Sequence, residues 1–443
     1  MGLKIGMASL GCAKNQTDAE IMLGILAEDG YSLADDPADA DILVVNTCAF
    51  IDSAKQESID AILEMAQYKA EGKCRLLIVT GCLAQRYKDE VLKELPEVDY
   101  VLGTGEFDRI CECIKNAEEG IRRADCGSAD RTPDDRLPRI LTTPPYTAYL
   151  KIADGCDNNC TYCAIPQIRG HFRSRPIENI VYEAEQLAES GVRELILIAQ
   201  DTTRYGQDIY GRYALCELLE ELVKIEGIEW IRAHYFYPEA VTEELIETMA
   251  RHDKICNYID IPVQHCDDYI LRRMARRTSE KEIRSKIAMI REKMPDAVIR
   301  TSIIAGFPGE SEEAFEKLCG FVRDIKFDRM GVFAYSREEG TAAADFEDQI
   351  DEEIKQERLD TLMTIQQEIS LELNRKRIGS VIEVIVEGYD EESFLFYGRS
   401  RGDSIEVDGK VYFGTEDEVE PGDIIKVEIL DAGEYDLMGK KVC

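Results

Sequence analysis

Short apolar runs alternate with amphipathic stretches through the first 125 residues. The runs LKIGMASL, DILVVNT and RLLIVTG are rich in β-branched residues, and each ends just before a cysteine. Continuous apolar runs of this length are typical of buried strands in a parallel sheet with helical crossovers. Thr17 and Glu20 match a capping box, which predicts that a helix begins there. Residues 1–125 are therefore predicted to form a parallel α/β domain.

The pattern then breaks and resumes. Residues 126–141 are rich in Pro and Asp and show no helical or strand period, which predicts a linker. A second α/β region is predicted over residues 142–375. Its six candidate strands are 147–153, 194–199, 229–235, 258–263, 298–304 and 330–335. Six strand–helix units are two fewer than a closed eight-fold barrel has, so we predict an open (β/α)6 barrel, three quarters of a TIM-type barrel.

A long helix and a small β domain complete the predicted organisation. Leu359, Leu362, Ile365, Ile369 and Leu373 recur every three or four residues, which predicts a helix over residues 351–377. The period then changes to two, so residues 376–443 are predicted to form a small all-β barrel. Asp408-Gly409 predicts a hairpin turn between two of its strands.

The charge of the chain is strongly negative. Its 443 residues include 53 Lys and Arg against 88 Asp and Glu, a formal net charge of −35. Such a chain repels nucleic acid and anionic membranes and attracts basic partners, although an acidic surface that only aids solubility is the alternative. Neither a signal peptide nor an apolar run of 18 residues is found, which predicts a cytoplasmic protein without a membrane segment. Its 15 cysteines are then expected to be reduced, and clustered ones favour metal binding.

Three cysteines lie close together directly after the first predicted barrel strand. Cys156, Cys160 and Cys163 form a C-x3-C-x2-C pattern with no fourth ligand close behind. Cubic iron–sulfur clusters normally take four cysteines, so three leave one iron free for a substrate or cofactor. Active sites of parallel barrels lie at the carboxyl ends of the strands, where this loop is predicted. A zinc loop or three unrelated thiols is the alternative interpretation.

Three further cysteines, Cys12, Cys48 and Cys82, each follow a predicted strand of the first domain. The carboxyl ends of parallel strands share one edge of a sheet, where ligand sites gather. These distant thiols can therefore meet at one point. Three buried free cysteines remain an equal alternative on position alone.

The barrel cysteines, with Tyr162 before the last of them, resemble those of the radical S-adenosylmethionine enzymes. The resemblance implies a 4Fe-4S cluster, bound S-adenosylmethionine and an external electron donor, which together generate a radical for an unactivated C–H bond. It also implies cofactor contacts from Tyr162, from Gln200 and Asp201 in LILIAQDTTRYG, and from Gly306 and Gly309 in TSIIAGFPGES. A tight turn is the alternative explanation of the two glycines.

The whole chain resembles one branch of these enzymes, the methylthiotransferases. SLGCAKNQTDAEIM, VVNTCAFIDSAKQESI and VTGCLAQRY are similar to the three cysteine segments of their N-terminal domain. The resemblance implies a second 4Fe-4S cluster on Cys12, Cys48 and Cys82, again with a free iron, and a C-terminal TRAM barrel. S-adenosylmethionine would then serve twice, as methyl donor and as radical source.

The remaining chemistry-bearing residues are expected to be structural. His234 and His265 fall near barrel strand ends and are expected to pack, with a place facing the pocket as the alternative. The other cysteines are expected to be structural or free: Cys74, Cys111, Cys113, Cys126, Cys216, Cys256, Cys266, Cys319 and Cys443.

Two substrates are possible within the family, an aspartate of a small-subunit ribosomal protein or an adenosine of transfer RNA. Residues 376–443 carry eight Lys and Arg against 17 Asp and Glu, a net charge of −9. An RNA-binding barrel needs a basic face, so RNA binding by this domain is disfavoured and a basic ribosomal protein fits better. SLGCAKN, YLKIADGC and IAQDTTRYG also resemble the ribosomal-protein branch. The expected activity is insertion of a methylthio group at the β-carbon of that aspartate. A non-catalytic iron–sulfur redox protein is a more remote alternative.

Overall fold

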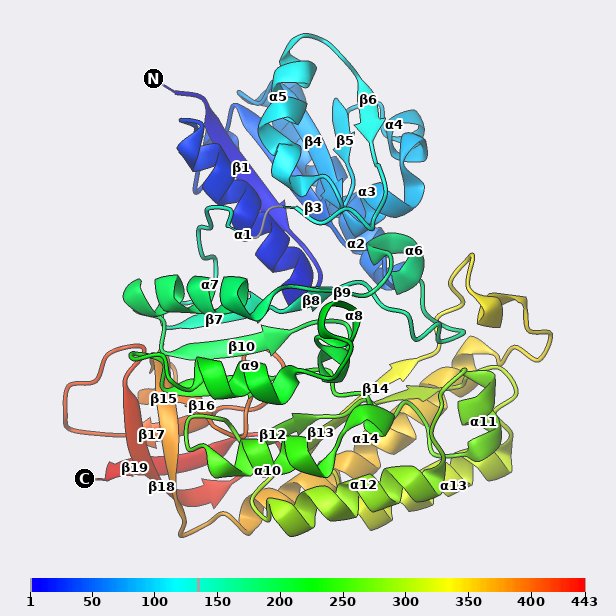
Figure 1. The fold of residues 1–443 in the computed structure, drawn as a ribbon, viewed down its shortest axis with the longest axis vertical. Coiled ribbons are helices and arrows are strands. Elements are labelled where there is room, and N and C mark those ends of the chain that lie inside the picture. Colours follow the sequence, from blue (N-terminus) through cyan, green and yellow to red (C-terminus); the bar gives the residue numbers. More distant parts are fainter. Residues whose placement is uncertain (1, 134–135, 443) are drawn as a thin grey trace.

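The N-terminal part is a six-stranded parallel sheet in the order β2-β1-β3-β4-β5-β6, covered by helices on both faces (Figure 1). The computed structural model describes residues 2–133 and 136–442. The strands are β1 (Lys4–Ser9), β2 (Ser32–Leu33), β3 (Ile42–Thr47), β4 (Leu76–Gly81), β5 (Tyr100–Leu102) and β6 (Arg123–Asp125). The helices are α1 (Ala13–Glu28), α2 (Asp52–Glu71), α3 (Cys82–Tyr87), α4 (Asp89–Glu94) and α5 (Ile110–Glu118). β3 and β4 are buried along their whole length, as apolar runs predict for a parallel sheet.

The predicted capping box is wrong. Helix α1 begins at Ala13 with Cys12 at its N-cap, so Thr17 lies inside the helix and its hydroxyl donates to the Ala13 carbonyl. The Glu20 carboxylate is bound instead by Arg139 and Thr142 of the segment that follows this domain. Partners distant in sequence therefore bind the Glu20 side chain, which a capping box would use locally.

The central part is a curved parallel sheet of six strands. It contains β7 (Thr147–Lys151), β10 (Glu194–Ile198), β11 (Trp230–Ala233), β12 (Tyr258–Asp260), β13 (Val298–Ala305) and β14 (Arg329–Ala334). β11-β10-β7 and β12-β13-β14 form two triplets, and a bridge between Ile231 and Ile255 links them. No pairing joins β7 to β14 within the described ranges, which agrees with the predicted open barrel.

Helices surround this sheet, and short elements carry its loops. The helices are α6 (Ile165–Arg169), α7 (Ile177–Glu189), α8 (Gln207–Tyr210), α9 (Leu215–Leu222), α10 (Glu243–Arg251), α11 (Asp268–Arg273), α12 (Glu280–Lys293), α13 (Glu312–Ile325) and α14 (Glu352–Arg375). A two-stranded sheet of β8 (Ala153–Asp154) and β9 (Arg173–Ser174) flanks β7. The apolar face of α14 packs on the barrel core, as its period predicts. None of the helices among the described residues is long and apolar enough to cross a membrane.

The C-terminal part is a closed five-stranded barrel, as the alternating pattern predicts (Figure 1). Its strands are β15 (Val381–Asp390), β16 (Leu395–Ser400), β17 (Val411–Gly414), β18 (Ile424–Ala432) and β19 (Leu437–Val442). The predicted hairpin at Asp408-Gly409 is wrong, because residues 401–410 form one loop between β16 and β17. The Asp408 carboxylate accepts a hydrogen bond from the Tyr258 hydroxyl of the central barrel, 2.6 Å away. The loop therefore folds against the larger domain instead of pairing with itself.

Buried ion pairs join the two barrels. Arg399 donates to the Glu194 carboxylate at 2.6 Å, and Arg232 donates to it at 3.1 Å. All three side chains are buried. Although burial raises the pKa of Glu194, the two guanidinium groups outweigh it and hold the pKa at about 2. The small barrel is therefore attached through a charge that stays ionised.

We expect Glu194→Gln to lower the free energy of unfolding by about 3–5 kcal/mol at pH 7, because it removes the carboxylate that pairs with buried Arg232 and one of the two carboxylates that pair with Arg399. Urea unfolding of the wild type and the variant measures this difference. Glu416→Gln, at an exposed position of the C-terminal barrel, is the control and should change little. A loss below about 1 kcal/mol would contradict the assigned role.

The same pair predicts a pH dependence. The pKa of Glu194 is lower in the folded protein than its ordinary value of 4.5, so its contribution is present above pH 4.5 and is lost as the pH falls toward 2. The difference in unfolding free energy between wild type and Glu194→Gln should shrink over this interval. A difference that is constant from pH 7 to pH 3 would contradict the prediction.

Candidate functional site

The three N-terminal cysteines meet at the carboxyl edge of the first sheet. Cys12 caps α1 after β1, Cys48 follows β3, and Cys82 opens α3 directly after β4. The thiol of Cys82 lies close enough to Cys12 and Cys48 for their charges to raise its pKa. The structure thus brings together three residues that are far apart in sequence, as predicted.

Glycines allow this approach. Gly11 has φ +91°, and a Cβ there would lie 2.8 Å from the Cβ of Cys48. Gly81 has φ +92°, and its Cβ would lie 2.5 Å from the side-chain oxygen of Asn46. Larger residues at these positions would be strained and would separate the loops that carry the thiols.

The barrel cysteines lie in the loop between β8 and α6, at the carboxyl end of the first barrel strand. The N–H of Cys163 donates to the carbonyl of Cys160 at 3.0 Å, which folds the loop back on itself. The Sγ of Cys160 lies 2.7 Å from the Tyr237 hydroxyl. The charges of Cys160 and Cys156 both raise the pKa of Cys163, so the three thiols face a common space.

Burial and nearby cations set the ionisation of the thiols. Burial raises the pKa of Cys82 to about 12 and that of Cys156 to about 11. Cys12 differs, because the desolvation that raises its pKa is outweighed by Lys14 and Arg169, which leave it below its ordinary value. A metal centre that binds thiolates must displace these protons.

Both groups fit iron–sulfur ligation. Each supplies three thiols, and thiolates are the ligands that such clusters take. No group of three or more His, Cys, Asp or Glu side chains is arranged to hold a single metal ion in the part of the chain that the structure describes. A four-iron cluster needs a different arrangement from a single metal ion, because each thiolate binds a separate iron.

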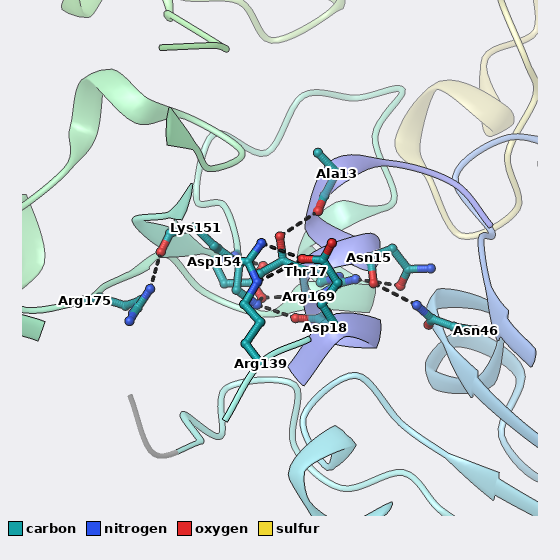
Figure 2. A network of polar contacts seen from close by, with 12 residues as sticks. Ala13, Asn15, Thr17, Asp18, Asn46, Arg139, Lys151, Asp154, Arg169 and Arg175 are labelled. Carbon is teal, nitrogen blue, oxygen red and sulfur yellow. Dashed lines mark hydrogen bonds and ion pairs between the residues drawn. The ribbon is translucent and has the colours of Figure 1, made fainter. Parts of the chain in front are cut away.

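A buried ionic network lies between the two cysteine groups (Figure 2). Arg169, at the end of α6, donates to the Asp18 carboxylate at 2.5 Å and to the side chain of Asn15 at 3.0 Å, both on α1. It also donates to the Sγ of Cys82 at 3.5 Å and to Asp154 at 3.3 Å. One side chain of the barrel loop therefore contacts the N-terminal thiol site directly.

Lys151 completes this network. Its ammonium pairs with Asp18 and with Asp154, which lies 3.4 Å away. Although burial raises the pKa of Asp154, Lys151 and Arg169 outweigh it and hold the pKa well below its ordinary value. Asp154 also accepts a hydrogen bond from the Gln200 amide at 2.8 Å. The network thus extends from the thiol site to the end of β10.

The predicted cofactor residues of β10 lie at its carboxyl end. The Gln200 side-chain oxygen is buried and has no hydrogen-bond partner among the described residues. A buried acceptor without a partner is costly and fits a ligand that brings a donor, such as an ammonium group. Asp201 is buried and accepts hydrogen bonds from Asn158 and Thr203. Burial raises its pKa above the ordinary value.

The other predicted cofactor residues lie beside β13. The ring of Tyr162 meets Phe307 edge to face, with centroids 6.5 Å apart. Gly306 and Gly309 have φ +73° and +83°, and neighbouring side chains occupy the place of a Cβ at each. The Gly306 N–H donates to Glu310. The structure therefore gives both glycines a packing reason, and their contact with a cofactor stays a prediction.

The two singled-out histidines are buried and hydrogen-bonded within the protein. His265 contacts Glu310 at 3.2 Å, and His234 contacts the Ser404 hydroxyl at 2.9 Å. Burial lowers the pKa of His234 to about 3, so it is neutral at pH 7. The eight described cysteines outside the two groups are free thiols. Cys443 lies outside the described residues.

Asp18, Asp154 and Arg169 were not predicted from the sequence. No local spacing joins them, since Asp18 and Arg169 are 151 residues apart. A signal was present for the glycines, because Gly11, Gly81 and Gly155 each directly precede a cysteine of the two groups. Gly155 has φ +78°, and a Cβ there would collide with the His171 carbonyl at 2.0 Å.

Three family models match successive parts of the chain. Residues 4–103 match the Uncharacterized protein family UPF0004, residues 150–322 match the Radical SAM superfamily, and residues 378–442 match the TRAM domain. These ranges cover the N-terminal sheet apart from β6, most of the open barrel and the closed C-terminal barrel.

Curated relatives match over almost their whole length. The chain is 53% identical to the "Ribosomal protein uS12 methylthiotransferase RimO" of Clostridioides difficile strain 630, covering 99% of this chain and 98% of that protein. It is 53% identical to the protein of the same name from Desulforamulus reducens, covering 98% and 99%. For the Geobacter sulfurreducens protein of this name the identity is 50%, covering 99% and 98%.

Solved structures support the fold. The radical S-adenosylmethionine methyltransferase TsrM from Kitasatospora setae, solved with cobalamin and a [4Fe-4S] cluster bound, aligns with a TM-score of 0.57 at 13% identity. This alignment covers 86% of this chain and 79% of that one. At this identity the likeness shows the shared α/β architecture and nothing finer. The near-complete match to the curated relatives identifies the family: the chain belongs to the RimO family of ribosomal protein uS12 methylthiotransferases.

Proposed function

We propose that this chain is a radical S-adenosylmethionine methylthiotransferase that inserts a sulfur atom and a methyl group at the β-carbon of an aspartate of ribosomal protein uS12. The observation that carries the proposal is the pair of three-thiol sites joined by Arg169, which contacts Cys82 directly. The relatives named for this activity match the whole chain. The proposal includes the division of the chain into an N-terminal domain (1–125), a linker (126–141), a radical S-adenosylmethionine core (142–375) and a TRAM domain (376–443).

Each thiol group is assigned one 4Fe-4S cluster. Cys156, Cys160 and Cys163 would hold one in the barrel, and the N-terminal trio Cys12, Cys48 and Cys82 would hold the other. When bound, the clusters and S-adenosylmethionine supply radical and methylthio chemistry, with electrons from an external donor. The chain itself buries Cys48 and Cys82 and positions the two sites through the Arg169 network.

The cofactor is assigned to the carboxyl end of the barrel. The unpartnered oxygen of Gln200 supports an amino-group contact there. Asp201 lies on the loop that follows β10, and Tyr162 lies on the loop that carries the barrel cysteines. Gly306 and Gly309 follow β13. These five residues form the proposed S-adenosylmethionine site.

The charge of the chain supports a protein substrate. A net charge of −35 attracts a basic ribosomal protein and repels RNA phosphates. The acidic C-terminal barrel has no excess of Lys and Arg that could bind RNA phosphates, so RNA binding by this domain is disfavoured. A direct assay must distinguish the proposed protein substrate from two alternatives, a transfer RNA substrate and a non-catalytic redox role.

The assay uses the anaerobically reconstituted, reduced full-length chain with S-adenosylmethionine. A uS12 peptide that contains the target aspartate and a transfer RNA are offered together, and mass spectrometry follows both. We expect a methylthio group on the peptide alone, with 5′-deoxyadenosine formed. Modification of the RNA alone would overturn the substrate, and an intact cluster without 5′-deoxyadenosine would overturn the enzyme.

The two thiol groups should be separable by substitution. Cys160→Ala should abolish 5′-deoxyadenosine formation, because it removes a ligand of the barrel cluster. Cys82→Ala should lose about half of the bound iron and all methylthio transfer, yet keep 5′-deoxyadenosine formation. Iron analysis and the same product assay measure both. Cys111→Ala is the control and should match the wild type; equal loss of both products in the two variants would contradict separate roles.

Gln200→Ala should weaken S-adenosylmethionine binding by about 10- to 100-fold, the range expected for one hydrogen bond to a charged group. Its iron content should remain that of the wild type, because Gln200 is not a thiol ligand. Equilibrium dialysis with labelled S-adenosylmethionine measures the change. Gln356→Ala on the exposed face of α14 is the matched control. Unchanged binding in Gln200→Ala would refute this contact.

A further inference from the structure

One buried lysine has no carboxylate partner. Three lysines are buried among the described residues: Lys14, Lys151 and Lys355. Lys151 pairs with Asp18 and Asp154, and Lys355 pairs with Glu352 at 2.6 Å. No ion pair forms at Lys14 in the described ranges, although its side chain is only 7% exposed. A buried charge is costly unless an anion compensates it, so this ammonium is prepared for one.

The contacts of Lys14 among the described residues are with a carbonyl and an aromatic ring, and none is with an anion. Its Nζ lies 3.4 Å from the Ala199 carbonyl oxygen and 3.5 Å from the ring centroid of Tyr235. Tyr235 adopts φ +63°, an uncommon conformation for a bulky residue. The Asp260 carboxylate holds it there by accepting from its N–H at 3.0 Å. The ring is therefore fixed beneath the ammonium by the barrel.

Lys14 lies between the two parts of the proposed reaction centre. It follows Cys12 by two residues, and its charge acts on both Cys12 and the barrel residue His234. Ala199 directly precedes Gln200 at the end of β10. On the same helix, Asn15 and Asp18 turn toward Arg169 (Figure 2), whereas the contacts of Lys14 are with β10 and the residues after β11. The ammonium thus lies between the N-terminal thiol group and the end of β10.

The ring beneath this ammonium belongs to an apolar cluster. Tyr149 and Ile198 of the barrel pack with Ala13, Tyr235 and Ile405, the last of which comes from the loop of the C-terminal barrel. Ser404 of that loop contacts the His234 ring at 2.9 Å. The loop therefore packs against the barrel residues that lie next to Lys14.

We propose that Lys14 binds the carboxylate of the substrate aspartate, and this inference rests on the proposed function. A buried ammonium that has no carboxylate partner and lies over an aromatic ring binds a short side chain with one negative charge. It also counters the repulsion between that carboxylate and a strongly acidic protein. Bound there, the aspartate has its β-carbon one bond from the carboxyl carbon, near the N-terminal thiol group and the end of β10. Lys14 is thus a specificity-determining residue.

The test compares two labelled uS12 peptides that differ only in Asp or Asn at the target position. Fluorescence anisotropy measures their binding to the reconstituted full-length chain with S-adenosylmethionine. We expect the wild type to bind the Asp peptide about 10- to 100-fold more tightly, and Lys14→Met to bind both equally. Lys14→Arg should keep part of the preference, and Lys93→Met, at an exposed lysine of α4, should keep all of it.

Each outcome decides the inference. It is overturned if the wild type binds both peptides equally, a result that needs no variant to fold. It is also overturned if Lys14→Met keeps wild-type iron content and the Asp preference, or loses S-adenosylmethionine binding with the preference intact, since the ammonium would then serve the cluster or the cofactor. If the wild type transfers no methylthio group to the Asp peptide, the proposed function fails instead.

Discussion

The contact between Arg169 and Asp18 is the interaction on which the rest of the site depends. The two side chains are buried and come from different domains. Breaking such a pair by removing one partner typically costs 3–5 kcal/mol, so it fixes the N-terminal sheet on the barrel. Arg169 ends the helix that follows Cys163 and also contacts Cys82. The same contact therefore fixes the position of one thiol group relative to the other.

All three parts of the chain contribute to the proposed reaction centre. The N-terminal sheet brings three thiols and Lys14, the open barrel brings three thiols and the end of β10, and the C-terminal barrel brings the loop that carries Ile405. The pair between Glu194 and Arg399 holds this loop in place from the opposite end of the barrel strands. The TRAM-type barrel therefore closes the base of the site, in addition to any contact that it makes with the substrate.

Much of the architecture could be predicted because its signals are local. The runs that became β3 and β4 are mostly apolar and are buried throughout, and the cysteines after them had to share one edge of a parallel sheet. Contacts between distant segments could not be predicted in this way. Glu20 has the spacing of a cap but binds Arg139, and Asp408 has the sequence of a turn but binds Tyr258. In both cases a buried tertiary partner overrides the local preference.

The same limit applies to the candidate site. The number and spacing of the thiols predict a metal centre. Nothing in the sequence distinguishes Arg169 and Lys14 from ordinary helix residues until their surroundings are known. The central claim is that each cysteine trio holds a four-iron cluster with one iron left without a protein thiolate. Mössbauer spectroscopy of the anaerobically reconstituted, ⁵⁷Fe-labelled chain tests it most directly. We predict two 4Fe-4S clusters per chain, with one iron of the barrel cluster changing its signal when S-adenosylmethionine is added. A single cluster per chain, or spectra that S-adenosylmethionine leaves unchanged, would contradict the claim.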